Sequence, residues 1–234
     1  MIVLSFLIGV CLASFIMVLA EPLSPLWRRS LCDDCHQPLR WHQLIPVISS
    51  WFLRRPCSNC HHQPHFIYGL IEVVIGILFV VTASVDLLNW TVIIVDIFIL
   101  ISLHVSLWDW RWRQIPVIDL IWLTSLTVLY LYLQGRLPVS SLVMFGLLTV
   151  LLIVWRFRKK PFPLASGDWV LLIIASSWIT LENLPIFLTI AGGLGILTAV
   201  IYKRYYQTPY FPFAPAILMA TWVCVVVLKI QCRV

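Results

Sequence analysis

Apolar residues gather along the chain in eight runs, and polar or charged residues separate each run from the next. A membrane-crossing helix needs about 20 predominantly apolar residues, and most of these runs approach that length. The run at 169–181 is short for a membrane span. We therefore expect its helix to extend beyond the run at both ends or to pack inside a bundle. The pattern predicts helices at 1–20, 66–85, 89–107, 115–133, 138–155, 169–181, 185–202 and 211–228.

One segment, 21–65, breaks the pattern because it is both long and polar. It is too short to bury a hydrophobic core of its own, so its fold needs a cross-link such as a bound metal ion. We therefore predict an all-α fold, a polytopic membrane helix bundle of about eight transmembrane helices. Its parts are a first transmembrane helix at 1–20, a cytoplasmic loop at 21–65 and a seven-helix membrane core at 66–234.

Composition narrows the class of protein. Hydrophobic residues make up 61% of the 234-residue chain and charged residues only 11%, whereas soluble domains carry about 25% charged residues. This argues against a soluble enzyme, a disordered tail or a nucleic-acid-binding domain. No basic residue precedes the first apolar run and no small-residue cleavage site closes it, so we expect no cleavable signal peptide.

The basic residues predict an orientation. If the loop after the first helix faces the cytoplasm, all of the 16 Lys and Arg residues lie inside except Arg136, Lys229 and Arg233. Cytoplasmic loops of membrane proteins carry an excess of Lys and Arg, which favours this orientation over its inverse. The net charge of +6 then reflects these loops, and with eight spans both termini face outside.

Four cysteines in the polar segment form two C-x-x-C pairs separated by 21 residues. This spacing predicts a tetrahedral zinc site that is structural, because four thiolates leave no open position. Two disulfides are the alternative, which a reducing cytoplasm disfavours, and a redox C-x-x-C would not need two copies. The predicted ligands are Cys32, Cys35, Cys57 and Cys60.

Other residues of metal-binding type are interpreted as structural. Three histidines beside the pairs could replace a ligand, but we expect them to be surface residues. Three further cysteines lie in or beside predicted spans, where a cysteine behaves as a small buried apolar residue. These residues are His36, His61, His62, Cys11, Cys224 and Cys232.

Two aspartates lie at predicted helix ends that face the same side of the membrane. Asp109 ends the third span, and Asp168 opens the sixth directly after Gly167, which we expect to free the backbone for a tight entry. Carboxylates at membrane depth are costly and often functional. A close pair can share one proton, one acting as base for a water and the other as acid, as in aspartic proteases.

Structural roles for this pair stay open from the residues alone. Asp168 could serve only to complement the dipole in the first turn of its helix. Asp109 could serve only as a partner for Arg113, four residues later.

Three further acidic residues have less defined roles. Asp96 lies mid-span, as a buried polar partner or a second functional site. Asp119 is the most plausible substitute for either member of the pair. Glu72 is a candidate acceptor for a hydrogen bond from the loop or from a substrate amine.

The order of these features resembles the type IV prepilin peptidases, which are membrane aspartic peptidases, over nearly the whole chain. The double C-x-x-C follows the first helix, as in the family. Asp109 begins a D-x5-I-P stretch, and Asp168 ends a stretch similar to GxGD. Further matching features are Gly9 and Ser14-Phe15 in the first helix, Tyr68, Glu72 and Gly76 in the second, and Pro212-Phe213-Ala214-Pro215 before the last.

The resemblance implies a function. Asp109 and Asp168 would be the catalytic aspartates of an endopeptidase that removes the leader from type IV prepilins or pseudopilins. Cleavage would occur at the cytoplasmic face of a bacterial cell membrane, with structural zinc in the loop. The partners would be the prepilin substrate and the lipid bilayer, with no nucleic acid. Many members also methylate the new N-terminus with S-adenosylmethionine.

The chain departs from the family pattern at four positions. Ala165 stands in place of the first glycine of GxGD, and Val117 in place of an acidic or amide residue after I-P. Met17 and Pro22 stand where Asn and Arg are common, which bears on methylation. The small size and the divergence resemble the competence-pilin branch of the family.

Two other classes of function compete with the peptidase. A transporter could use Asp96, Asp109 and Asp168 as a proton or cation path, but it needs carboxylates near the midplane and only Asp96 lies there. A non-enzymatic assembly factor could carry the same zinc-stapled loop. Incubation with a prepilin, followed by a search for the shortened product, separates the three.

Overall fold

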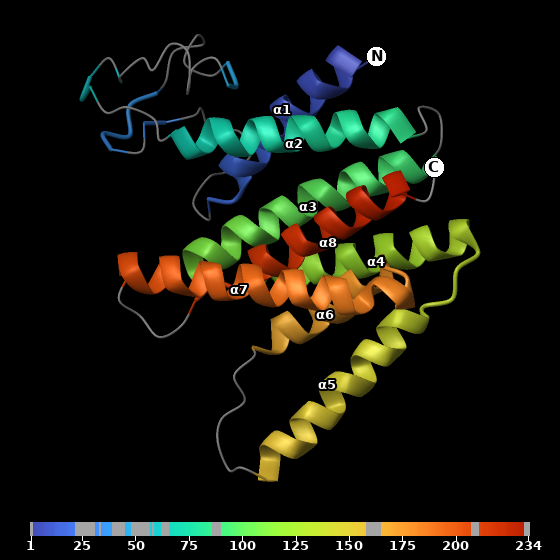
Figure 1. Ribbon diagram of the computed structural model, residues 1–234. Coiled ribbons are helices and arrows are strands. Elements are labelled where there is room, and N and C mark those ends of the chain that lie inside the picture. Colours follow the sequence, from blue (N-terminus) through green and yellow to red (C-terminus); the bar gives the residue numbers. More distant parts are fainter. Residues whose placement is uncertain are drawn as a thin grey trace. The chain divides into compact units, whose positions relative to one another are not determined.

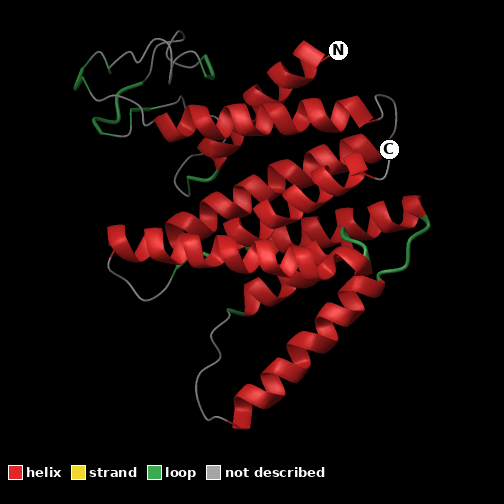
Figure 2. Cartoon of the chain, in the orientation of Figure 1, coloured by secondary structure: helices red, strands yellow, loops and turns green. Residues whose placement is uncertain are grey.

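A computed structural model describes most of the membrane part of the chain and portions of the polar segment. Within the described residues the regular elements are helices, apart from one isolated β-bridge between Leu31 and Pro38 (Figure 2). The all-α prediction is therefore confirmed. The described residues are 2–21, 31–32, 34–38, 45–47, 57, 59–61, 66–85, 90–157, 165–206 and 211–231.

Each of the eight predicted helices is present in this described part (Figure 1). Among the described residues, the 3-10 turn η3 directly precedes the seventh helix. The elements are α1 (Ile2–Leu19), α2 (Phe66–Val85), α3 (Trp90–Trp112), α4 (Val117–Gln134), α5 (Val139–Phe157), α6 (Ser166–Ser177), η3 (Leu181–Asn183), α7 (Leu184–Tyr206) and α8 (Ala214–Gln231).

Six of these helices, α1 to α5 and α7, are long and apolar enough to cross a membrane. The sixth predicted run is short, as expected: α6 has 12 residues and rises about 18 Å, against a hydrocarbon core of about 30 Å. In α8 the described apolar stretch, Ala214–Val225, is also shorter than a full span. The chain is therefore a multi-pass membrane protein in which α6 is too short to cross the membrane as a regular span.

Turn residues in the sequence set the helix ends. Gly135 follows α4 with a left-handed φ of 60°, a conformation that glycine adopts without steric cost. The Gly135 N–H donates to the Tyr132 carbonyl at 3.2 Å, and the Arg136 N–H donates to the Leu131 carbonyl at 3.0 Å. These bonds satisfy carbonyls that the end of a helix leaves unpaired.

The chain forms two compact units, Met1–His104 and Val105–Val234, and the boundary falls inside α3. In the first unit α1 packs against α2. A Cβ on Gly9 would lie 3.1 Å from the Gly76 Cα, and one on Gly76 would lie 2.7 Å from Val10 Cγ2. The two glycines therefore allow the backbones to approach closely, as small residues do between membrane helices.

In the second unit α6 contacts α4, α5 and α8, while α7 packs against α8. The C-terminal end of α6 is held by polar contacts. The Trp178 indole donates to Thr127 Oγ1 at 2.9 Å and stacks on Tyr130, with 4.2 Å between ring centroids. The Ser140 hydroxyl donates to the Ile179 carbonyl at 2.7 Å. These contacts position α6, which carries Asp168 at its other end.

Candidate active site and metal centre

Asp109 lies in the last turn of α3 and is 6% exposed. Its Oδ2 accepts the N–H of Ala214, the first residue of α8, at 3.0 Å. The Phe213 N–H also interacts with this carboxylate. Asp109 therefore caps the N-terminus of a helix 105 residues further along the chain.

The cap follows from how α8 begins. The Ala216 and Ile217 N–H groups donate to the Phe213 carbonyl, and Pro215 has no N–H. The Ala214 N–H consequently needs an acceptor from elsewhere, and Asp109 supplies it. Sequence reasoning noted the segment 212–215 only as a family resemblance, because a contact between distant segments leaves no local pattern.

Asp109 does not pair with Arg113, so that alternative is wrong. The Arg113 N–H donates to the Asp109 backbone carbonyl at 2.9 Å, and Arg113 leaves α3 with a φ of 55°. Its guanidinium lies over the Tyr202 ring, 5.9 Å from the centroid. The Trp110 ring meets the same tyrosine edge to face, with 5.5 Å between ring centroids. Arg113 and Trp110 at this end of α3 therefore both contact the Tyr202 ring.

Asp168 is the third residue of α6 and is 9% exposed. Its carboxylate interacts with the N–H of Ala165, the N-cap residue, whose own side chain forms no capping bond. This is the reach-back half of a capping box, so the first-turn role considered from the sequence is present. The Asp168 charge also acts on Asp109. The two buried carboxylates therefore lie within electrostatic range of each other.

Gly167 serves a different purpose from the one predicted. It lies inside α6 without a left-handed φ, so the backbone does not require glycine there. A Cβ on Gly167 would instead lie 3.1 Å from Ile115 Cδ1. The glycine thus makes room for the residue that precedes Pro116. The neighbouring Ala165 has a φ of −70°, so alanine at the first position of the GxGD-like stretch fits without strain.

Two neighbouring buried carboxylates can divide acid and base roles. Like charges close together in a poorly solvated site disfavour double ionisation, so a pair of this kind can hold one proton over a wide pH range. The ionised member can accept a proton from water, and the protonated member can donate one to a leaving group.

Asp96 and Asp119 have surroundings of their own. The Thr82 hydroxyl of α2 donates to Asp96 Oδ1 at 2.7 Å, which makes Asp96 a half-buried polar partner between α2 and α3. Asp119 is the third residue of α4 and is buried. Its N-cap residue, Pro116, has no N–H, so Asp119 cannot complete the capping box that Asp168 forms.

Glu72 connects the polar segment to the first two helices. It is 5% exposed, and its Oε2 accepts the Val47 N–H at 2.6 Å. The Ser14 hydroxyl of α1 also bonds to this carboxylate. The predicted hydrogen bond from the loop to Glu72 is confirmed. Val47 has a φ of 61°, which is strained for a β-branched residue.

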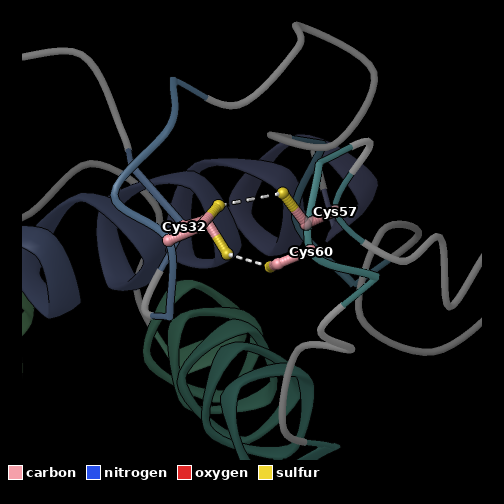
Figure 3. Close-up of side chains that lie close together, drawn as sticks. Cys32, Cys57 and Cys60 are labelled. Atoms are coloured by element: carbon pink, nitrogen blue, oxygen red, sulfur yellow. Dashed lines mark hydrogen bonds between the residues drawn. The ribbon is translucent and has the colours of Figure 1, made fainter.

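The four cysteines of the C-x-x-C pairs converge on one point (Figure 3). They are free thiols whose sulfurs all lie within 4.8 Å of one another. Cys32 Sγ lies 3.5 Å from Cys60 Sγ, and Cys35 Sγ lies 3.6 Å from Cys57 Sγ. Sulfurs about 2.3 Å from a tetrahedral ion lie about 3.8 Å apart, so this cluster fits a metal ion.

The two pairs have the same backbone geometry. The His36 N–H donates to the Cys32 carbonyl and the His61 N–H to the Cys57 carbonyl, both at 3.0 Å. The two histidines have φ values of 55° and 59° and are exposed, which confirms them as surface residues. Each therefore closes a turn that aims two sulfurs at the centre. His62 lies outside the described residues.

The local backbone also favours the metal-binding form of Cys57. The N–H groups of Cys60 and Asn59 lower the pKa of the Cys57 thiol to about 6. A thiolate near neutral pH is the form that binds a metal. Of the remaining cysteines, Cys224 is buried as predicted, but Cys11 is exposed on α1, so its predicted burial is wrong. Cys232 lies outside the described residues.

Comparison with known proteins places the chain in a family. The family model described as the Bacterial Peptidase A24 N-terminal domain matches residues 7–85, and the model of the type IV leader peptidase family matches residues 96–200. The chain belongs to the type IV leader peptidase family. The first model includes the four paired cysteines and Glu72, and the second includes Asp109 and Asp168.

Several relatives with known names are similar to this chain. A "Prepilin leader peptidase/N-methyltransferase" of Neisseria gonorrhoeae is 27% identical over 83% of this chain and 69% of the relative. A protein of the same name from Aeromonas salmonicida is 24% identical over 83% of this chain and 70% of its own length. A protein of the same name from Myxococcus xanthus is 35% identical over 44% of this chain and 31% of its own length. No solved structure matches.

Proposed function

We propose that this chain is a bacterial membrane aspartic endopeptidase that cleaves the leader peptide from type IV prepilins or pseudopilins. The observation that carries the proposal is the pairing of Asp109 and Asp168, two buried carboxylates from the ends of α3 and α6 that interact electrostatically. Membership of the type IV leader peptidase family supports the same reaction.

The pair would hydrolyse a peptide bond in a proton-balanced way. The ionised aspartate accepts a proton from water while the water oxygen attacks the scissile carbonyl carbon. The protonated aspartate donates its proton to the amide nitrogen as the C–N bond breaks. The two residues have then exchanged protonation states, so the pair again holds one proton. Water supplies the hydroxyl of the new acid and a hydrogen of the new amine.

Replacement of each aspartate by asparagine tests this function. Asp109→Asn and Asp168→Asn should each abolish cleavage, because asparagine keeps the size and one acceptor oxygen but cannot transfer the proton. The controls are Asp96→Asn, on α3 like Asp109, and Asp119→Asn, on α4; both are expected to keep substantial activity.

The measurement is processing of one prepilin on gels by all four variants at equal expression. An inactive Asp119→Asn beside an active Asp109→Asn would mean that the pair is misassigned. Normal processing by all four would exclude the aspartic-peptidase mechanism and favour the assembly factor.

We propose that the four-cysteine cluster holds a structural zinc ion, within a three-part organisation of 1–20, 21–65 and 66–234. Four thiolates at tetrahedral separation support zinc. The purified protein should contain about one zinc per chain. Cys32→Ser/Cys35→Ser should remove the metal and lower the thermal midpoint, while remaining folded protein keeps some cleavage activity. Metal-free wild-type protein with an intact fold, or disulfides between the paired cysteines in cells, would contradict the zinc assignment.

We place the catalytic pair and the polar segment at the cytoplasmic face of the bacterial membrane. Five described basic residues support this side, because they lie at the C-terminal ends of alternate helices, as the positive-inside bias favours. They are Arg111 in the last turn of α3, Arg113 just after it, Arg156 in α5, and Lys203 and Arg204 in α7, whereas Arg136 after α4 and Lys229 in α8 would lie on the opposite side.

Methylation of the new N-terminus is a second candidate activity, favoured by the N-methyltransferase in the name of the relatives. It would require S-adenosylmethionine. The two family departures in the first helix region are Met17, which is buried in α1, and Pro22, which lies outside the described residues. We propose that methylation, if the chain performs it, is separable from cleavage. Mass spectrometry of the mature substrate N-terminus tests this.

A further inference from the structure

Gly195 of α7 lies against the aromatic ring of Phe213, just ahead of α8. A Cβ on Gly195 would lie 2.5 Å from Phe213 Cε2 and 3.0 Å from Cδ2. Non-bonded carbon atoms rest about 3.5 Å or more apart, so any larger side chain would push the ring by about 1 Å. Gly195 is buried and has no left-handed φ, so glycine is needed here for space.

The Phe213 ring cannot easily move by itself. Pro212 and Pro215 flank it, and each proline fixes its own φ. The ring also meets Phe211 edge to face, with 6.1 Å between centroids. The Phe213 carbonyl accepts the Ala216 N–H at 3.1 Å. A displaced ring would therefore shift the short backbone segment 212–215.

That segment holds the Asp109 carboxylate. Ala214 is fully buried, and its N–H donates to Asp109 Oδ2 at 3.0 Å. The Phe213 N–H contacts the same carboxylate. A continuous series of contacts thus runs from Gly195 through the Phe213 ring to the Ala214 N–H and Asp109.

We propose that Gly195 is a positioning residue for Asp109, acting through Phe213 and Ala214. The absence of a side chain at Gly195 lets the Phe213 ring seat, which places two backbone N–H groups on the carboxylate. This inference rests on the proposed function, because it assigns Gly195 to the geometry of a catalytic aspartate.

The test compares two glycines of the same helix. Gly195→Ala should lower kcat for prepilin cleavage by about a hundredfold with KM unchanged, because misplacement of a reacting group by about 1 Å can have that effect. Gly192→Ala is the matched control: it lies three residues earlier in α7, with no atom within 4 Å of the added Cβ. It should cleave at the wild-type rate.

A compensating change separates positioning from general damage. Gly195→Ala/Phe213→Leu removes the ring atoms that the new methyl group would meet, so it should recover much of the kcat lost in Gly195→Ala. If Gly195→Ala does not fold, a folded but inactive double variant overturns the proposal, whereas an active one supports it.

Hydrogen exchange of the Ala214 amide gives a readout that does not depend on activity. This amide should exchange slowly in the wild type and in Gly192→Ala, and faster in Gly195→Ala. If the wild type fails to cleave prepilin but this exchange pattern holds, the proposed function fails while the contact series stands. Wild-type cleavage by Gly195→Ala with a protected Ala214 amide overturns the inference.

Discussion

Asp109 and Asp168 each accept backbone N–H groups at the start of a helix, so each has a structural task beside its proposed chemical one. The structural tasks fix the carboxylates: Asp109 is held by α8, and Asp168 by its own N-cap residue, Ala165. A carboxylate fixed in this way loses little freedom when it engages water and substrate, which favours catalysis.

Replacing each aspartate by glutamate measures how closely the position of the carboxylate must be kept for cleavage. Asp109→Glu and Asp168→Glu should each lose about a hundredfold or more of the cleavage rate, because one added methylene displaces the carboxylate by about 1 Å. Asp119→Glu should lose much less. The rates come from time courses of prepilin shortening. Near wild-type rates for both glutamate variants would show that the positions are not those of a catalytic pair.

Between elements, the polar segment is attached to α1 and α2 through one buried carboxylate. Glu72 of α2 accepts a bond from Ser14 of α1 and from Val47 of the loop. The Val47 backbone is left-handed, which costs an L-residue about 1–2 kcal/mol. The carboxylate therefore stabilises a strained turn, and that strain makes the attachment testable.

We expect Glu72→Gln to lower the free energy of unfolding by about 1 kcal/mol, because the bond from the Val47 N–H to a carboxylate becomes a weaker bond to a neutral amide oxygen. Val47→Gly should raise it by about 1 kcal/mol, since relief of the left-handed strain exceeds the entropic cost of glycine. In the double variant Glu72→Gln should be less harmful than alone. Unfolding measured in detergent on all four proteins gives the coupling energy. Strict additivity would contradict the attachment, and Val47→Ala serves as the control.

At the scale of the whole molecule, a lipid environment explains why so many large apolar side chains are exposed on the surface of the described residues. Large apolar side chains are exposed along α5, for example Leu142, Phe145 and Val150. Such a surface suits lipid contact, because lipid tails are as apolar as these side chains and burying them inside the protein gives no hydrophobic gain. Two helices, α6 and α8, begin with the residues that form or hold the proposed catalytic pair.

Orientation in the membrane is the prediction at this scale. A cysteine introduced at Gln134, at the end of α4, should react with an impermeant thiol reagent added outside intact cells. One introduced at Lys203, near the end of α7, should react only after the cells are opened. The positive-inside distribution of Lys and Arg is the reason. Labelling of the Lys203 site alone from outside would invert the topology.

The sequence by itself determined the helices and pointed to the four paired cysteines and the two aspartates as candidate site residues. Each of these features has a local sequence pattern: apolar runs of membrane length, a fixed C-x-x-C spacing, or acidic residues at helix ends. A lipid environment strengthens the first signal, because only helices satisfy their backbone within one segment. This is why all eight helices could be located from the apolar pattern before any contact was known.

Only the tertiary structure decided how these pieces meet. No local pattern shows that the Ala214 N–H lacks a partner in its own helix and takes Asp109, or that Gly195 leaves room for Phe213. The sequence also misassigned Gly167, whose value is the space it leaves for Ile115. Packing and unpaired N–H groups depend on which distant segments come together, and that information appears only when the chain is folded.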